Sequence, residues 1–293
     1  MIQDLKKVLN TQSADKKYSL LIPTWNNLDY LKLCIESIRK NSVFSHQIII
    51  LINEGVDGTY EWIQSQPDLD YVYSPKNIGI CYGLNICRSL ILSQYVVYLN
   101  DDMYVLPGWD KALNDEILAI GHNSFILSGT MIEPTDTGNP CVVVKNYGDN
   151  LKDFQESSLL NEFESLTKDD WSGSTWPPNI MHIDLWDLVG GMSIEYSPGM
   201  YSDPDLSMKL WISGVRIFKG VGKSKVYHFG SKSTKRVKTN KGSSMFIMKW
   251  GMTSGSFVKT YLKRGEKYTG ELAEPKSSLF FKLKNTYQRI KQF

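Results

Sequence analysis

The chain has 293 residues, of which 42% are hydrophobic and 22% charged, so it can build a large core, either as one α/β domain with an appended subdomain or as two domains. No stretch reaches the roughly 18 apolar residues of a membrane span and the first residues lack a signal-peptide core, so we expect a cytoplasmic protein. Four cysteines lie in or beside apolar runs without C-x-x-C spacing, which argues against zinc or a disulfide framework and predicts buried free thiols at Cys34, Cys81, Cys87 and Cys141.

The formal net charge of +2 hides an asymmetry along the chain. Residues 1–215 carry 14 Lys and Arg against 28 Asp and Glu, whereas residues 216–293 carry 19 against 3. A basic C-terminal quarter suits nucleic acid, a phosphorylated ligand or an anionic membrane surface. A solvated basic face is the alternative.

The first hundred residues alternate between two patterns of apolar residues. Short apolar or aromatic runs predict strands at 18–25, 47–53, 71–74 and 95–100. Helical spacing of apolar residues predicts helices at 28–41 and 81–94. This alternation is typical of a parallel sheet, whose ligands bind beyond the carboxyl ends of the strands. Thr24, Glu54, Asp101 and Asp102 fall at those ends.

Asn100, Asp101 and Asp102 end a buried strand with two adjacent carboxylates. Burying like charges side by side is unfavourable unless a partner compensates them. Asp and Asn also stop strands and open turns for purely local reasons. The stretch therefore indicates either a turn or a site for a divalent cation.

The polarity and periodicity of the sequence change several times along the rest of the chain. Residues 135–175 are polar with little periodicity and suggest an insertion or long loop. A helix opened by Asp203 and Asp205 follows at 203–214, and residues 215–230 predict one or two strands. The composition of residues 231–244 predicts a basic loop, and we expect a helix and tail beyond it.

Three common catalytic or nucleotide-binding motifs are missing. The first strand runs into "IPTWNN" and lacks the G-x-G-x-x-G of dinucleotide-binding proteins. "GVGKSK" at 220–225 ends like a Walker A loop, but Ile217 stands where its first glycine belongs. No G-x-S-x-G elbow is present, so serine-hydrolase chemistry is not supported.

Seven motifs occur along the chain in the order "SLLIPTWNN", "INEGVDGT", "SPKNIGICYGLN", "YLNDDMYVLPGW", "LVGGM", "SDPDLSMKLWISG" and "KVYHFGSKS". In this order they resemble the motifs of family 2 glycosyltransferases with the GT-A fold, over residues 17–233 without the 135–175 insertion. The resemblance implies an inverting enzyme that transfers a sugar from a nucleoside diphosphate sugar to a hydroxyl of a glycan or glycolipid. It also implies Mn²⁺ or Mg²⁺ as cofactor and no nucleic-acid partner.

The resemblance further implies roles for single residues. The donor nucleotide would contact Pro23, Thr24, Trp25, Glu54, Asn77, Gly79, Asn100 and Asp101. Asp102 and His228 would bind the metal, although a lone histidine between aromatic residues is also a common core residue. Asp203 would be the general base and Asp205 the helix N-cap.

The acceptor side and the closing loop are implied in the same way. Gly190 and Gly191 would let the backbone approach the acceptor or the transferred sugar, and Trp176 would stack on a sugar. Three further tryptophans could stack on sugars or belong to the core, namely Trp171, Trp186 and Trp211. Three basic side chains of the 231–241 loop would close over the diphosphate, namely Lys232, Lys235 and Arg236.

The resemblance implies a Rossmann-like α/β domain over residues 1–242, with a mostly parallel sheet and helices on both faces. Residues 1–102 would bind the nucleotide, and residues 103–242, with the 135–175 insertion, would bind the acceptor. Residues 243–293 would form a basic helical C-terminal extension.

Two other functions share parts of this pattern. A nucleotidyltransferase also pairs a parallel sheet with a metal-binding Asp, but "IPTWNN" lacks the Gly-rich loop with a basic residue that it needs. A catalytically silent protein on the same fold could bind nucleotides or carbohydrates. The presence of Asp102, Asp203 and His228 together favours an enzyme.

The last predicted helix is amphipathic. Apolar residues recur at near-helical spacing between Lys and Arg, at Leu279, Phe280, Leu283, Tyr287 and Ile290. Such a helix could lie on an anionic membrane, as peripheral contact at the cytoplasmic face. It could equally pack its apolar stripe on the domain.

Overall fold

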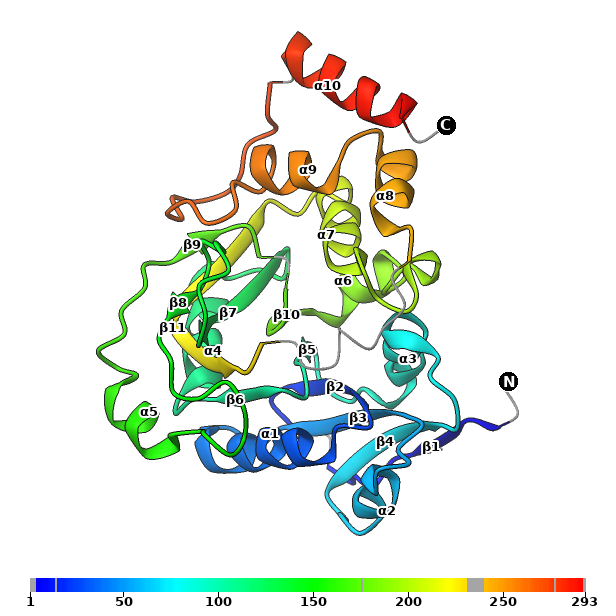
Figure 1. The fold of residues 1–293 in the computed structure, drawn as a ribbon, viewed down its shortest axis with the longest axis vertical. Coiled ribbons are helices and arrows are strands. Elements are labelled where there is room, and N and C mark those ends of the chain that lie inside the picture. Colours follow the sequence, from blue (N-terminus) through cyan, green and yellow to red (C-terminus); the bar gives the residue numbers. More distant parts are fainter. Residues whose placement is uncertain (1–3, 14, 175, 231–239, 277, 292–293) are drawn as a thin grey trace.

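The computed structural model describes the chain from residue 4 to residue 291, except residues 14, 175, 231–239 and 277. The described residues form an 11-stranded mixed sheet with helices on both faces (Figure 1). The strands are β1 (Lys6–Val8), β2 (Ser19–Trp25), β3 (Gln47–Asn53), β4 (Leu69–Ser74), β5 (Tyr95–Tyr98), β6 (Met103–Val105), β7 (Phe125–Glu133), β8 (Val143–Val144), β9 (Trp171–Ser172), β10 (Asn179–His182) and β11 (Ile217–His228).

The helices follow the same α/β alternation. They are α1 (Leu28–Asn41), α2 (Thr59–Gln64), α3 (Gly79–Cys87), α4 (Trp109–Ile120), α5 (Glu156–Glu162), α6 (Ile183–Leu188), α7 (Ser202–Ile212), α8 (Gly242–Trp250), α9 (Ser254–Thr260) and α10 (Leu279–Ile290), with 3-10 turns η2 (Arg88–Leu90) and η3 (Ile194–Tyr196). The 28–41 helix and the 47–53 strand have the bounds that the sequence predicts.

The strand order is β1-β4-β3-β2-β5-β10-β7-β11-β6, with β8 beside β7 and β9 beside β11. β4, β3, β2 and β5 are parallel, as the sequence predicts. β10 runs antiparallel between β5 and β7, and β11 is parallel to β7 but antiparallel to β6. The carboxyl ends of β2, β5, β7 and β11 therefore meet at one edge, where β6 begins.

Alternate residues of the strands belong to two apolar layers, one on each face of the sheet, because successive side chains of a strand point to opposite faces. Leu20 and Ile22 pack with α1 and α4 on one face. Leu21 and Leu51 pack with α3, α6 and α7 on the other. Both faces of the central strands are thus covered, which explains why their sequences are apolar almost throughout.

The 135–175 segment is more ordered than its composition suggests. It contains β8, α5 and β9. Tyr147 and Leu159 are buried in an apolar cluster with Tyr104, Tyr227 and Phe229, which lie in or beside β6 and β11. Long-range packing onto these strands supplies the order that local periodicity does not predict.

The four cysteines are buried and free, as the sequence predicts. α8 and α9 contribute Phe246 and Phe257 to the same apolar layer as α7, and α10 lies beyond them at one end of the molecule (Figure 1). Within the described residues, no helix has both the length and the apolar content needed to cross a membrane.

Gly83 allows α3 to pack closely on β3, and this contact makes a stability prediction. A Cβ at Gly83 would lie 2.0 Å from Cδ2 of the fully buried Leu51. The overpacking cost of about 1–3 kcal/mol outweighs the gain in helix propensity of about 1 kcal/mol. Gly83→Ala should therefore lower the free energy of unfolding in urea.

Gly255→Ala is the matched control, because Gly255 is also helical and a Cβ there would meet nothing within 4 Å. This variant should be unchanged or more stable by up to about 1 kcal/mol. Equal stability of the two variants would contradict the close packing of α3 on β3.

Candidate active site

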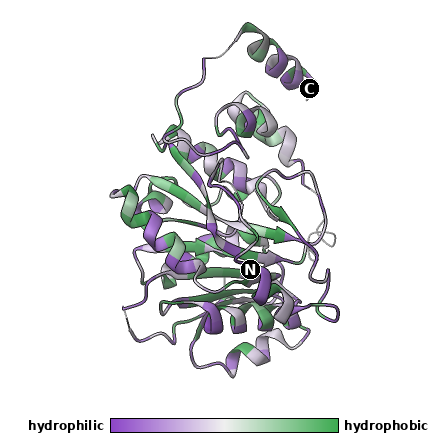
Figure 2. Cartoon of the chain, turned by 90° about the vertical axis from the view of Figure 1, so that its left-hand side faces the viewer, coloured by the Kyte–Doolittle hydropathy of each residue, from purple (hydrophilic) through white to green (hydrophobic). Residues whose placement is uncertain are grey.

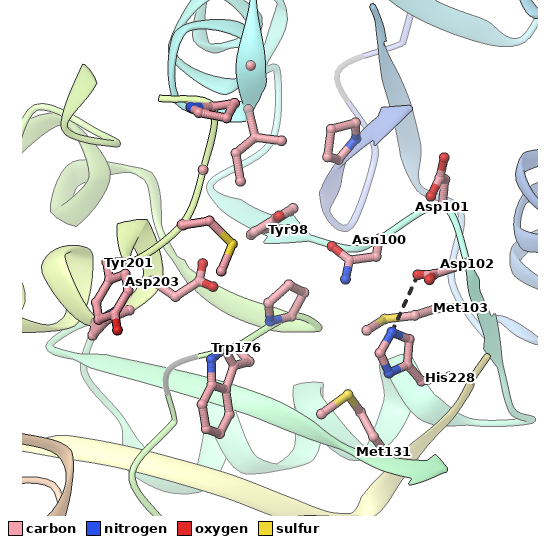
Figure 3. A pocket seen from close by; sticks show the side chains of 18 of the residues that line it. Tyr98, Asn100, Asp101, Asp102, Met103, Met131, Trp176, Tyr201, Asp203 and His228 are labelled. Atoms are coloured by element: carbon pink, nitrogen blue, oxygen red, sulfur yellow. Dashed lines mark ion pairs between the residues drawn. The ribbon is translucent and has the colours of Figure 1, made fainter. Parts of the chain in front are cut away.

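A cavity of about 620 Å³ opens at the carboxyl edge of the sheet, within the size range of small-molecule sites (Figure 3). It brings together eleven residues that the sequence singles out, namely Pro23, Thr24, Trp25, Asn77, Gly79, Asn100, Asp101, Asp102, Trp176, Asp203 and His228. Glu54, Gly190 and Gly191 are not among the residues that line it.

Three neighbouring strands place a histidine between two carboxylates. His228 of β11 pairs with Met103 of β6, which sets His228 beside Asp102. Tyr227 of β11 pairs with Ile132 of β7, which sets the next residue, His228, beside Glu133. His228 Nδ1 lies 2.8 Å from Glu133 Oε1, and His228 Nε2 lies 3.5 Å from Asp102 Oδ1 (Figure 3). Strand register alone therefore brings these three residues together.

The protonation of His228 follows from this arrangement. Burial by itself would lower the pKa of the imidazole, but contacts with Asp102 and Glu133 more than compensate and raise the pKa of His228 to about 9. His228 Nε2 is buried and makes no hydrogen bond to any residue that the structure describes. It is aimed at Asp102 and the cavity, while Glu133 fixes the ring orientation.

These residues fit a divalent cation of the Mn²⁺ or Mg²⁺ type. A carboxylate and an imidazole lie side by side, and the second imidazole nitrogen is held by a carboxylate, as in many metal sites. No group of three or more His, Cys, Asp or Glu side chains suited to a metal occurs in the described ranges. An ion at Asp102 and His228 would therefore need further oxygen ligands from substrate or water.

The end of β2 lines another part of the pocket. Thr24 donates its hydroxyl to Asp101 Oδ2 at 2.7 Å, which ties β2 to the turn after β5. Glu54 accepts hydrogen bonds from Trp25 Nε1 at 2.9 Å and from Asn26 Nδ2 at 3.0 Å. Glu54 thus positions Trp25 rather than facing the cavity itself.

Gly79 brings the start of α3 against the loop that contains Pro198. Its φ is +75°, and a Cβ would lie 2.7 Å from Pro198 Cα. This close approach lets Ile80 N–H donate to the Pro198 carbonyl at 2.9 Å. Asn77 Oδ1 accepts from Gly79 N–H at 2.9 Å and shapes the same turn. The loop that leads to Asp203 is therefore held directly against the start of α3.

Asp203 lies across the cavity from Asp102 and His228 (Figure 3). The residue is partly exposed towards the cavity, but its Oδ1 is buried and accepts no hydrogen bond from the described residues. Burial raises the pKa of Asp203 to about 7. A carboxyl group with a pKa near neutrality can accept and return a proton at physiological pH.

The expected N-cap role of Asp205 is wrong. α7 begins at Ser202 with Tyr201 as its N-cap, and Asp205 is fully buried within the helix. Its carboxylate accepts from Ser193 Oγ at 2.5 Å and Trp250 Nε1 at 2.8 Å, and it pairs with Lys249 at 2.9 Å. Asp205 thus anchors α8 to α7, because a buried carboxylate requires such partners.

The two glycines expected near the acceptor, Gly190 and Gly191, are not among the residues that line the pocket. Gly191 packs against Trp186 and Asn85, and Lys209 donates to its carbonyl and to that of Val189 at the end of α6. Both glycines have positive φ, as a helix C-terminus requires. Three of the four candidate stacking tryptophans are core residues, namely Trp171, Trp186 and Trp211.

Some lining residues carry no signal in the sequence. Glu133 is the last residue of β7, and its role becomes visible only from its contact with His228 on the neighbouring strand β11. Arg264 places its guanidinium over the Trp176 ring, 4.4 Å from the centroid, and Ser254 and Val258 of α9 complete this wall. The basic residues Lys232, Lys235 and Arg236 lie outside the described residues.

Known proteins resemble this chain in sequence pattern and in fold. The model of the family described as Glycosyl transferase family 2 matches residues 19–164. The structure of GalNAc-T7 with UDP, GalNAc and Mn²⁺ superposes with a TM-score of 0.58 at 14% identity, covering 84% of this chain and 50% of that one. S. aureus TarS 1-349 in complex with UDP-GlcNAc gives a TM-score of 0.56 at 12% identity, covering 94% and 72%.

At such low identities the structural likeness shows the fold alone, which is the GT-A glycosyltransferase fold. This chain spans half the length of the GalNAc-T7 chain. No curated protein sequence matches it.

The different surroundings of Asp203 and Asp205 predict opposite effects on stability. An Asp with a pKa of about 3.9 when unfolded and about 7 when folded binds its proton more tightly in the folded state, so stability falls as pH rises between these values. At pH 8, Asp203→Asn should therefore raise the free energy of unfolding by about 1 kcal/mol or more.

Asp205→Asn should instead lower it by about 2 kcal/mol or more, because it removes the charge from a buried, fully paired group. Urea denaturation of both variants at pH 8 measures the two changes. A loss of stability in Asp203→Asn would contradict the unfavourable burial of that carboxylate.

Proposed function

We propose that this chain, a member of glycosyl transferase family 2, moves a sugar from a nucleoside diphosphate sugar to a hydroxyl of a glycan or glycolipid, with inversion at the anomeric carbon. One observation carries the proposal: Asp203 faces the Asp102 and His228 pair across a single pocket (Figure 3). The structures of TarS and GalNAc-T7 hold UDP or UDP-GlcNAc, which makes UDP-sugars the first donors to test.

The nucleotide would lie along the ends of β2 and β5. Pro23, Thr24 and Trp25 line this side of the pocket, and Glu54 holds the Trp25 indole in place. Asn100 and Asp101 lie in the turn after β5 and line the same pocket (Figure 3). Polar groups here would select the base and ribose, while the apolar body of Trp25 and the ring of Pro23 would exclude water.

Asp102 and His228 would hold Mn²⁺ or Mg²⁺ at the diphosphate. When bound, such an ion supplies charge that offsets the negative charge gained by the departing diphosphate. Glu133 would keep the His228 ring oriented through its 2.8 Å contact with Nδ1. The protein would contribute two ligands, and the phosphate oxygens would complete the site.

Asp203 would activate the acceptor. Its carboxylate takes the proton of the acceptor hydroxyl as that oxygen forms a bond to the sugar anomeric carbon. The bond from this carbon to the phosphate oxygen breaks, and its electron pair leaves with the diphosphate. Because Asp203 and the Asp102 and His228 pair lie on opposite sides of the pocket, a single displacement with inversion fits the arrangement.

The acceptor would enter between Trp176 and α9. Trp176 lines the pocket near Asp203, and Arg264 is the only Lys or Arg among the described lining residues. Gly265 N–H donates to the Ser172 carbonyl at 2.9 Å, which fixes the backbone beside Arg264. An aromatic face next to a fixed cation suits a sugar that carries an anionic group.

The pKa of Asp203 predicts the pH dependence of transfer. The base must be ionised, so kcat/KM should rise about tenfold per unit below pH 7 and level off above it. Rates with saturating Mn²⁺ between pH 5.5 and pH 8.5 test this. Asp203→Asn should lose about 10² to 10⁴ in rate together with this rise. A profile that stays flat between pH 5.5 and pH 7 in the wild type would contradict the role of Asp203.

The Asp102 and His228 pair predicts metal dependence that binding alone can reveal. Calorimetry should show that Mn²⁺ strengthens UDP binding to the wild type but not to Asp102→Asn, because the variant loses an anionic ligand. Transfer by this variant should fall at least about a hundredfold. Asp57→Asn is a matched control outside the pocket lining, since the Asp57 carboxylate accepts a hydrogen bond from Leu28 N–H at the start of α1. Near-normal transfer by Asp102→Asn in chelator would exclude the metal site.

A further inference from the structure

α10 exposes an apolar face that the rest of the described chain leaves uncovered. Leu279, Leu283, Tyr287 and Ile290 are 73%, 60%, 56% and 63% exposed, and we call them the outer face of α10. Residues four apart and then three apart lie on one side of a helix. Figure 2 shows α10 at one end of the molecule. The outer face is therefore one continuous stripe rather than scattered exposure.

The opposite side of α10 already has its protein partners. Asn285 is 3% exposed, and its Oδ1 accepts from Thr253 N–H at 3.0 Å. The Phe281 ring packs against Tyr261, with centroids 6.3 Å apart. Rotation of α10 to bury its outer face would break these contacts. The sequence alternative of an apolar stripe packed on the domain is therefore wrong for these four residues.

Cations border the outer face on both sides. Residues 278–291 contain Lys282, Lys284, Arg289 and Lys291 and no Asp or Glu. Lys284, Arg289 and Lys291 are exposed, and Lys291 Nζ lies 4.5 Å from the centre of the Tyr287 ring. At about 100° per residue, Lys284 and Lys291 flank one border of the stripe and Arg289 the other.

We propose that the outer face of α10 docks on the surface of an anionic lipid bilayer. The apolar side chains would enter the boundary between headgroups and acyl chains, and the flanking cations would contact the phosphates. A second copy of α10 fits poorly, because its borders are also cationic and would repel. Nucleic acid would use the cations but would leave the leucine and isoleucine side chains in water.

The docking surface is connected to the pocket. Thr253, which Asn285 holds, is the N-cap of α9, and Ser254 and Gly255 at the start of α9 line the cavity. Docking would therefore bring the wall beside Trp176 and Arg264 close to the membrane, where a lipid-linked acceptor resides. This last step rests on the proposed function, whereas the docking itself does not.

Co-sedimentation with vesicles tests the docking without any sugar substrate, so it succeeds or fails independently of glycosyl transfer. The wild type should bind vesicles of phosphatidylglycerol and phosphatidylcholine but not vesicles of phosphatidylcholine alone. Raising the salt from about 0.05 M to about 0.5 M should weaken binding at least about tenfold, because surface charges are screened.

Leu283→Ser combined with Ile290→Ser should lower the partition coefficient on anionic vesicles at least about tenfold, because two large apolar side chains no longer leave water. Leu188→Ser is the matched control, since Leu188 is 67% exposed on α6, and it should bind like the wild type. Lys284→Gln with Arg289→Gln should lose most of the salt dependence, and circular dichroism checks that α10 stays helical.

Three outcomes would overturn the proposal. The first is that the wild type fails to sediment with anionic vesicles at low salt. The second is equal binding to neutral and anionic vesicles. The third is a dimer in analytical ultracentrifugation that Leu283→Ser with Ile290→Ser dissolves while vesicles bind nothing, which would make a second copy the partner instead.

Discussion

The imidazole of His228 is held between Asp102 and Glu133, and the layout of the pocket follows from this contact. The three residues come from the ends of adjacent strands, so their meeting requires the register of β6, β11 and β7. Acidic groups gathered in one buried edge must each find a partner or stay protonated. Asp101 accepts a hydrogen bond from Thr24, and Asp102 and Glu133 both contact the imidazole of His228. Asp203 Oδ1 accepts nothing from the described residues, and burial raises the pKa of Asp203 accordingly. One pocket thus holds carboxyl groups in two kinds of surroundings.

Much of the fold and site follows from local signals. The periodicity of 28–41 and the apolar run at 47–53 fix a helix and a strand to the residue, because burial of one helix face or of both strand faces leaves a clear pattern. The order of the motifs singles out Asp102, Asp203 and His228, and the fold brings these three residues to one pocket. β10 is harder to place, since an antiparallel strand inserted between β5 and β7 has no local mark. Glu133 and Arg264 acquire meaning only from their neighbours in space.

Two residues show why a pattern alone assigns roles badly. Asp203 and Asp205 stand two apart at the start of α7, and either could cap the helix or act as a base from sequence alone. The fold turns one towards the cavity and the other into a cluster with Ser193, Lys249 and Trp250. In α10, likewise, the apolar spacing does not tell which side faces the body. The contacts of Asn285 and Phe281 decide this and leave the leucines outside.

The central claim is that burial keeps the Asp203 carboxyl group ready for proton transfer, while the neighbouring carboxylates contact Thr24 and His228. The most direct test is a carbon-13 NMR titration of the Asp203 carboxyl carbon, identified by its absence in Asp203→Asn. The account predicts a midpoint near pH 7 for the wild type without substrate. A midpoint near pH 4, the ordinary value for an exposed aspartate, would contradict it.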